Sequence, residues 1–170
     1  MKKVLVLLGL IGAMALSGKT EPFSNLEEKG GKMVVKSTGV PFTGIAEETF
    51  KDGKTVKLKV DYKNGIVDGA TRTFYEFNGK PEEEFVSKGG KKDGMLKRYY
   101  ITGKIKAKEQ YKNGVLNGEA VEYYENGNIK SEGIWANGKQ NGDFKEYGEN
   151  KQIRVKTTWK NGAKVAVKEY

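Results

Sequence analysis

The chain contains no cysteine and no histidine among its 170 residues. It therefore forms no disulfides, offers no thiol nucleophile and lacks the usual ligands of a zinc site. Without histidine it also lacks the commonest general acid–base residue of enzymes. Carboxylates occur in runs, as at Glu82-Glu83-Glu84, but neighbours on a strand point to opposite faces, so no pair has the arrangement of a glycosidase site. We expect no catalytic residue, no metal site, no cofactor and no enzymatic activity.

Proline is scarce as well, with three residues against 23 glycines, and the mean hydropathy is −0.68. Many glycines in a chain with few apolar residues favour numerous turns around a thin core. No segment beyond residue 18 keeps a helical period of hydrophobic residues. The sequence therefore indicates strands and turns.

The first 18 residues, Met1–Gly18, predict a secretory signal peptide. Lys2 and Lys3 precede an apolar run, Val4–Leu16, and small residues follow it. The run is short for a membrane span, which favours cleavage near Ala15 to Gly18 over an uncleaved anchor. We expect an exported protein that is periplasmic, on the outer surface or secreted.

The formal charge is +9, or +7 without the two leader lysines (29 Lys+Arg against 22 Asp+Glu). A basic surplus favours a protein partner or an anionic surface such as lipid or glycan. Because lysine dominates over arginine, we do not expect specific nucleic-acid binding, which prefers the arginine fork.

A repeat of 24 to 25 residues fills most of the chain. One glycine anchors each unit, at spacings of 25, 25, 24 and 24 residues: Gly44, Gly69, Gly94, Gly118 and Gly142. Eight Asn-Gly and three Asp-Gly pairs punctuate the apolar segments. Because both residues of such a pair tolerate positive φ, these pairs predict consecutive hairpin turns.

The second strand of each unit alternates apolar and charged side chains, as in Val56–Val60. A period of two predicts one buried and one wet face, which an antiparallel meander allows. The predicted fold class is all-β: an elongated single-layer twisted antiparallel sheet of consecutive β-hairpin repeats with a period of 24–25 residues and no helix outside the leader.

Three regions follow from this pattern: a signal peptide at 1–18, a tether and N-terminal capping hairpin at 19–39, and a repeat array at 40–170 with five units and a closing half. Gly30-Gly31 is the predicted turn of the capping hairpin. The third unit departs from the pattern around Phe85–Asp93, where we expect a bulge or a weaker joint.

The segment Tyr111–Gly133, YKNGVLNGEAVEYYENGNIKSEG, resembles the bacterial variant form of MORN repeats. Further copies lie at Tyr62–Gly79 and Trp135–Tyr147, with an opening motif at Pro41–Gly44, so the resemblance covers Val40 to Gly162. It implies a hairpin array and a binding role. Proteins with such repeats include secreted proteins of host-associated bacteria, for which adhesion or invasion is proposed, and antitoxin components of toxin–antitoxin systems.

Aromatic residues recur with the repeat in two ladders: Phe50, Tyr75, Tyr100 and Tyr124, and Tyr62, Tyr111, Trp135 and Trp159. We interpret them as the core, the alternative being a stacking platform for sugar or lipid. A third line precedes the first ladder and points to the other face, which makes it the candidate exposed aromatic line: Phe74, Tyr99, Tyr123 and Tyr147.

Basic residues at equivalent positions of successive repeats predict a stripe, which is either a track for an anionic partner or a solvated face. Its members are Lys57, Lys59, Lys106, Lys108, Lys130, Arg154 and Lys156. The preferred hypothesis is an exported, non-enzymatic module that binds a macromolecular partner, with host-directed adhesion or invasion as one form of it. The alternatives are an antitoxin or immunity module that neutralises a toxin and a peripheral binder of anionic membrane.

Overall fold

The structure is a computed structural model that describes residues 19–170, so the predicted leader lies outside the described residues. Apart from one three-residue 3-10 helix, η1 (Phe23–Asn25), the regular elements of this part of the chain are strands. Their bounds are β1 (Thr20–Pro22), β2 (Leu26–Lys29), β3 (Lys32–Val35), β4 (Gly44–Thr49), β5 (Val56–Lys63), β6 (Ile66–Phe74), β7 (Pro81–Lys88), β8 (Lys91–Lys92), β9 (Gly94–Tyr99), β10 (Ile105–Lys112), β11 (Val115–Tyr123), β12 (Ile129–Ala136), β13 (Lys139–Gln140), β14 (Gly142–Tyr147), β15 (Ile153–Lys160) and β16 (Ala163–Glu169).

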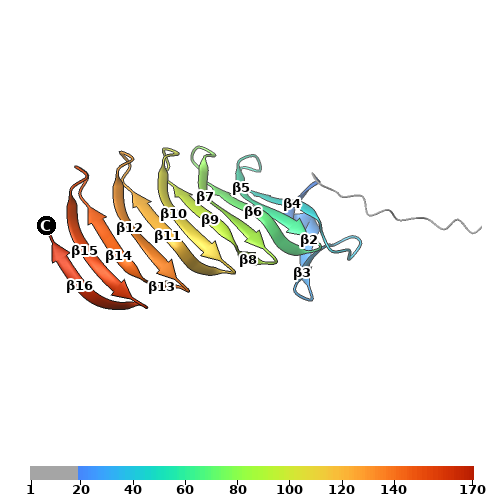
Figure 1. The fold of residues 1–170 in the computed structure, drawn as a ribbon. Helices are drawn as coiled ribbons and strands as arrows, with labels where there is room; N and C mark the ends of the chain where they lie inside the picture. The colour runs from blue at the N-terminus through green and yellow to red at the C-terminus, as the bar shows by residue number, and fades with distance from the viewer. Residues whose placement is uncertain (1–18) are drawn as a thin grey trace, which may run out of the picture.

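A single 14-stranded sheet contains β1 and the strands from β4 to β16, and its strand order follows the chain (Figure 1). From β4 onward neighbouring strands are antiparallel, and the two-residue strands β8 and β13 pair only with β7 and β12. The hairpin β2–β3 forms a separate two-stranded sheet. The predicted fold class is therefore confirmed. Within residues 19–170, no helix is long and apolar enough to cross a membrane.

The segment predicted as a tether is instead part of the fold. Thr20–Pro22 pairs with β4 in parallel, and the backbone N–H of Ile45 donates a 2.8 Å hydrogen bond to the carbonyl oxygen of Lys19. Phe23 in η1 packs edge-on against Tyr62, with ring centroids 6.5 Å apart. The tether prediction was wrong because this contact joins residues about 40 positions apart, which local composition does not reveal.

Two kinds of turn form the two long edges of the sheet. At the lower edge in Figure 1, the turn edge, both central residues of each two-residue turn have positive φ, as at Asn113 (50°) and Gly114 (84°). At the opposite edge, the loop edge, three- or four-residue loops carry one residue of positive φ, as at Gly127 (90°). The primed-type geometry of the turn edge is the one predicted for Asn-Gly pairs.

Four of the eleven Asn-Gly and Asp-Gly pairs are not hairpin turns. They contain the repeat-anchoring glycines Gly69, Gly94, Gly118 and Gly142, which lie within or at the start of strands. At Gly69 (φ 128°) the register of β5 and β6 shifts, and Asp61 accepts a 2.8 Å hydrogen bond from the backbone N–H of Ala70. A side chain at Gly69 would meet Asp61 at 2.7 Å. The anchor glycine thus lies in a β-bulge, where the absence of a side chain leaves room for the side chain of a residue on the neighbouring strand.

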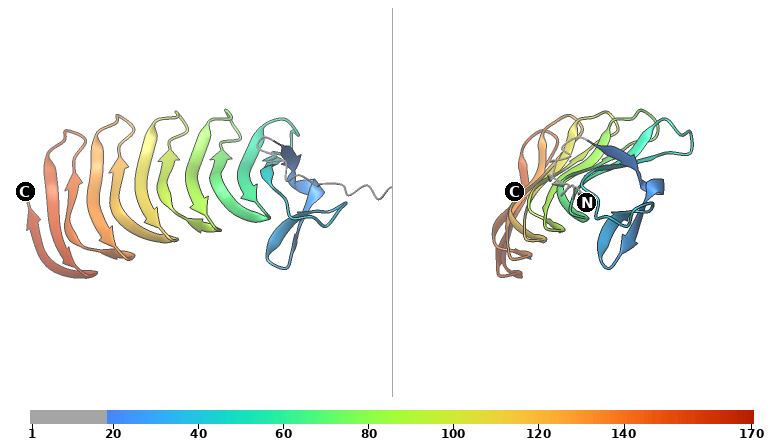
Figure 2. Two further views of the ribbon diagram at one scale, coloured as in Figure 1. Left: turned by 45° about the vertical axis from the view of Figure 1, so that its right-hand side comes forward. Right: turned by 90° about the vertical axis from the view of Figure 1, so that its right-hand side faces the viewer.

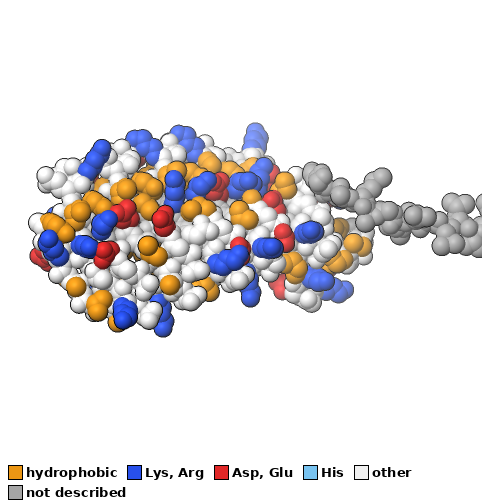
Figure 3. Space-filling view, in the orientation of Figure 1, with side chains coloured by type: hydrophobic (Ala, Val, Ile, Leu, Met, Phe, Trp, Pro, Cys, Tyr) orange, Lys and Arg blue, Asp and Glu red, His pale blue; other side chains and the backbone are white. Residues whose placement is uncertain are grey.

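The sheet is curved, and the N-terminal elements lie inside the curve (Figure 2). Leu26, Phe42 and Ala46 form the most enclosed cluster, with Met33 and Tyr62 packed against it. We call the face that carries Ala46 the concave face and the opposite one, seen in Figures 1 and 3, the convex face. The β2–β3 hairpin and η1 cover the concave face only at its N-terminal end.

The bulge expected in the third unit is present, because the register of β7 shifts between the pair Ser87–Lys92 and the pair Glu84–Lys97. The register of β12 shifts in the same way in the next unit, so the third unit follows the regular pattern and is not a distinct, weaker joint. Gly89 (φ 56°) and Gly90 (φ 79°) adopt the same turn as the Asn-Gly pairs. The backbone N–H of Gly90 bonds to the carbonyl oxygen of Val67 at 2.8 Å, as the turn glycines of the other units do in their preceding repeat. Two glycines satisfy the positive-φ requirement that Asn-Gly meets elsewhere.

Candidate binding faces

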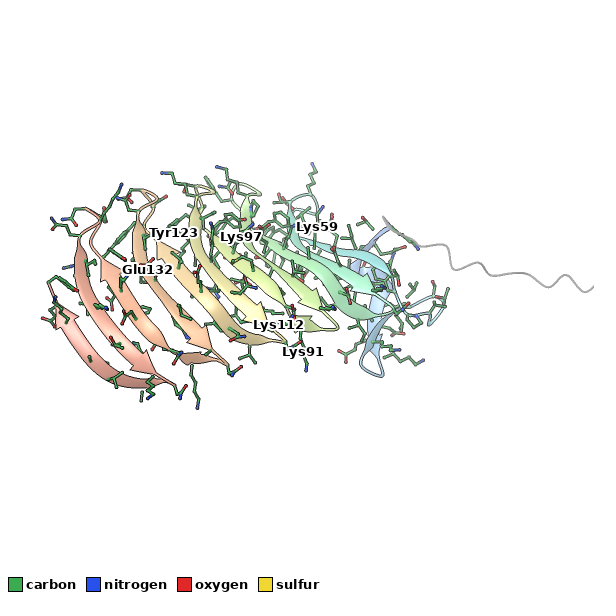
Figure 4. The ribbon with its side chains drawn as sticks, viewed as in Figure 1. Lys59, Lys91, Lys97, Lys112, Tyr123 and Glu132 are labelled. Atoms are coloured by element: carbon green, nitrogen blue, oxygen red, sulfur yellow. The ribbon has the colours of Figure 1, made fainter. Side chains whose placement is uncertain are left out.

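Register across the sheet brings one row of residues together on the convex face. Directly paired residues point to the same side of a sheet, so each pairing extends the row by one strand. The resulting convex row is Glu47, Lys59, Arg72, Glu84, Lys97, Lys108, Val121, Glu132, Lys145, Lys156 and Lys168. Figure 4 labels Lys59, Lys97 and Glu132 along it.

Carboxylates compensate most of the charge of the convex row. Four of its lysines make ion pairs: Lys59 with Glu47 (2.9 Å), Lys97 with Glu84 (3.0 Å), Lys145 with Glu132 (3.1 Å) and Lys156 with Asp143 (2.7 Å). Figure 3 shows basic, acidic and apolar side chains interleaved on this face. The row is therefore a ladder of ion pairs.

The predicted lysine stripe does not lie on one face. Lys59, Lys108 and Lys156 belong to the convex row, whereas β-bulges turn the other four members to the concave face. The register of β5 shifts around Lys57, so this residue shares the face of Leu58, and its Nζ lies 2.9 Å from the Glu48 carboxylate. Lys130 likewise pairs with Glu122 at 3.1 Å, while Lys106 and Arg154 line hollows of the concave face.

The candidate exposed aromatic line lies on the convex face, as alternation predicted, but its four side chains are half-buried. The hydroxyls of Tyr99 and Tyr147 donate hydrogen bonds of 2.7 Å to Glu84 and Glu132 of the convex row. Burial, followed by the bond to Glu84, raises the pKa of Tyr99 to about 12. Tyr99 and Tyr147 thus stabilise the ladder of ion pairs through these hydrogen bonds. Their hydroxyls are therefore not free to contact a ligand.

The first aromatic ladder connects consecutive repeats. The hydroxyls of Tyr75, Tyr100 and Tyr124 donate to the backbone carbonyl oxygens of Tyr99, Tyr123 and Tyr147, at 2.6, 2.6 and 2.7 Å. Sequence reasoning placed these aromatics in the core but missed their hydrogen bonds. The phenolic oxygen itself was the available signal, because the ladder contains tyrosine at three of four positions.

Beyond the N-terminal elements, the concave face forms a trough lined by aromatic residues from β7 to β15. Its large side chains are Phe85, Tyr111, Trp135, Phe144 and Trp159, all half-buried. Trp135 and Phe144 pack edge to face, with centroids 6.0 Å apart. A hollow of about 470 Å³ opens beside them, with Ala107 and Ala120 at its floor. The second ladder is therefore a half-open layer.

Charged groups alternate with the aromatics in this trough. The guanidinium of Arg98 bonds to Glu83 at 3.0 Å and to Glu109 at 2.6 Å. The Nζ of Lys92 lies 4.3 Å from the centroid of the Phe85 ring. Within residues 19–170, no group of three or more histidine, cysteine, aspartate or glutamate side chains is placed to hold a metal ion. The trough thus offers aromatic surface and fixed charges as its binding chemistry.

Comparison with known protein families finds a match for part of the repeat array. Residues 92–113, 116–137 and 140–161 match the family described as MORN repeat variant. Three consecutive repeats of this chain are therefore MORN-type. Each match begins after a turn-edge glycine and ends at the next Asn-Gly pair, so one MORN match is one loop-edge hairpin. No curated protein matches the chain. MORN repeats are generally protein- or membrane-binding modules and are not typically enzymes.

Proposed function

We propose that this MORN array is an exported, non-enzymatic binding module that holds a macromolecular partner in the concave trough. One observation carries the proposal: the trough from β7 to β15 is lined by large aromatics, and the N-terminal elements cover a different part of that face. Apolar surface of this kind is typical of binding grooves, where aromatic and arginine side chains contribute most of the affinity.

The trough suits a protein segment better than a small molecule. Its hollow is open to one side and continues across several repeats, so a ligand that spans repeats gains contacts that a single sugar or metabolite cannot. Arg98, Lys106 and Glu122 lie beside the Trp135 and Phe144 rings and would orient polar groups of that segment. The predicted leader supports export, and an adhesion role would follow if the partner belongs to a host cell.

A site-specific photo-crosslinker tests which face of the sheet binds the partner. We would place it at Ser131, which lines the trough, and at Ile134 of the same strand, which is 51 % exposed on the convex face. Crosslinking to one stoichiometric partner from position 131, and not from position 134, is the expected result. The opposite preference would show that the convex face carries the interaction.

Two further outcomes bear on the wider proposal. Recovery of a small toxic protein as the sole stoichiometric partner would favour the antitoxin or immunity alternative over adhesion. Mass spectrometry of the native protein tests export, since we expect the mature chain to begin near Ala15 to Gly18 and to fractionate outside the cytoplasm. Turnover of a substrate by the purified protein at enzymatic rates would contradict the non-enzymatic role.

A further inference from the structure

We propose that the turn edge of the array binds a linear anionic polysaccharide along a rim of lysines. The lysine rim consists of Lys63, Lys88, Lys91, Lys112, Lys139 and Lys160, which flank the five two-residue turns from Asn64-Gly65 to Asn161-Gly162. Each turn carries at least one of them, and all six are exposed. Figure 4 labels Lys91 and Lys112 at this edge, away from the convex row.

Hydrogen bonds between repeats hold the rim in a single file. The backbone N–H of each turn glycine bonds to a carbonyl oxygen of the preceding repeat, as from Gly114 to Lys92 (2.7 Å) and from Gly162 to Gln140 (2.8 Å). One repeat contributes two strands, so successive turns are about 9.5 Å apart. The rim is thus a row of positive charges with a fixed step.

Most lysines of the rim lack a carboxylate partner, unlike the lysines of the convex row. Within residues 19–170, Lys112 is the rim lysine that makes an ion pair, with Asp93 at 3.0 Å. The nearby Asp68 carboxylate accepts a hydrogen bond from the backbone N–H of Gly89. Five lysines therefore face solvent without a carboxylate partner in the described part of the chain, which is what an anionic polymer requires.

A polysaccharide fits this edge better than a lipid bilayer or a nucleic acid. The step of about 9.5 Å is close to the length of two pyranose rings in an extended chain, so an anionic sugar can recur at every turn. Exposed amides at Asn64, Asn113, Asn137 and Asn161 can bond to sugar hydroxyls. Val115 is the large apolar residue of these turns that is clearly exposed (44 %), so the edge offers little to insert into lipid. Lysine in place of arginine disfavours nucleic acid.

Binding of polygalacturonate oligosaccharides by the whole protein tests this proposal, with dextran of equal length as the neutral control. We expect salt-sensitive binding that strengthens with chain length up to about eight sugars, since four steps of two sugars span the rim. The variant Lys91→Glu/Lys139→Glu/Lys160→Glu should bind at least about a hundredfold more weakly, since the loss of each lysine alone costs about fivefold next to an anionic surface and each glutamate adds repulsion. The matched control, Lys51→Glu/Lys54→Glu/Lys151→Glu, makes the same change of charge at the loop edge and should lose less than tenfold.

Three results would overturn the proposal: no binding of polygalacturonate at low salt, equal losses in the two triple variants, or binding to phosphatidylglycerol vesicles without binding to the oligosaccharide. Unfolding curves of both variants establish that they fold. Because the rim and the concave trough are separate, Ser131 crosslinking should be unchanged in the rim variant. A result that contradicts polysaccharide binding at the rim would therefore not contradict partner binding in the trough. A result that contradicts binding in the trough would likewise leave the rim proposal intact.

Discussion

The hydroxyl of Tyr100 donates a 2.6 Å hydrogen bond to the backbone carbonyl oxygen of Tyr123, in the next repeat. The same bond recurs from Tyr75 to Tyr99 and from Tyr124 to Tyr147. A single-layer sheet has little core, so these bonds are a means by which one repeat stabilises the next.

Removing one of these hydroxyls should weaken the array. Tyr100→Phe keeps the ring but leaves a half-buried carbonyl without its partner, so we expect the free energy of unfolding to fall by about 1 kcal/mol in urea. Tyr123→Phe is the matched control, since this hydroxyl makes no hydrogen bond within residues 19–170, and it should change stability by less than about 0.5 kcal/mol. Equal effects of the two variants would contradict the inter-repeat role.

Lys151 occupies a position that favours glycine. Its φ is +69°, and the equivalent loops of the preceding units have Gly103 and Gly127 there, each at φ +90°. Lys151→Gly should raise the free energy of unfolding by about 1 kcal/mol, because a non-glycine residue pays about that much in the left-handed region. Lys54→Gly is the control: Lys54 does not have positive φ, so added chain entropy should make that variant neutral or less stable.

Gly133 leaves room for the ring of Phe144. A Cβ at Gly133 would lie 2.6 Å from the Phe144 ring, and its φ is not in the positive range. Gly133→Ala should therefore destabilise by overpacking, by about 2 kcal/mol. In the background Phe144→Ala the same change should cost much less, and a double-mutant cycle measures this coupling. Additive effects would show that backbone conformation, and not the ring, requires glycine.

Acid should destabilise the convex ladder. The bond from Tyr99, then the Lys97 ammonium, lowers the pKa of Glu84, and Tyr147 and then Lys145 lower that of Glu132. A carboxyl whose pKa is lowered in the folded protein stabilises the fold at pH values above 4.5, the ordinary pKa of the group. This contribution is lost as the pH falls below 4.5 and through the lowered pKa. Glu84→Gln/Glu132→Gln should flatten the loss of stability below pH 4.5, by less than about 1 kcal/mol because both sites are screened by solvent. Glu76→Gln/Glu149→Gln is the matched control, since both side chains are exposed and make no ion pair within residues 19–170. Equal effects of the two double variants would contradict the role of the ladder.

Alkali should act through Tyr99, whose pKa lies near 12 instead of 10.0 because of burial and then the bond to Glu84. The neutral hydroxyl is favoured in the folded protein, so its contribution is present below pH 10 and lost as the pH rises toward 12. Tyrosinate absorbance should show a late component that Tyr99→Phe removes. Glu84→Gln should move that component toward lower pH, and an unmoved component would assign the late titration to another tyrosine.

Local sequence was enough for the repeat, the strands and the turn edge. Period-two alternation fixes which residues share a strand face, and Asn-Gly pairs such as Asn113-Gly114 select two-residue turns because both residues tolerate positive φ. The fold class followed from these local rules. The same rules overcounted the turns, because Gly69 and Gly118 use positive φ for bulges inside strands.

The candidate site was harder to predict because it depends on pairing between strands. A bulge of one residue sends Lys57 and Lys106 to the face opposite Lys59 and Lys108, so the predicted stripe divides. A closer alignment of the repeats would have found one signal: Glu84 and Glu132 stand where other units have lysine. The repeat pattern did not reveal the lysine rim, because some of its lysines precede their turn and others follow it. They therefore do not recur at one fixed position of the repeat.

By itself, the sequence determined a hairpin array of 24 to 25 residues per unit, since turn and strand preferences act within a few residues. The tertiary structure decided the rest: which way the sheet curves, that Thr20–Pro22 joins it, and which lysines keep a free charge. Those properties arise from register, bulges and the stacking of one repeat on the next. They depend on contacts between different strands, such as Glu47 with Lys59 and Phe23 with Tyr62, that no local pattern specifies.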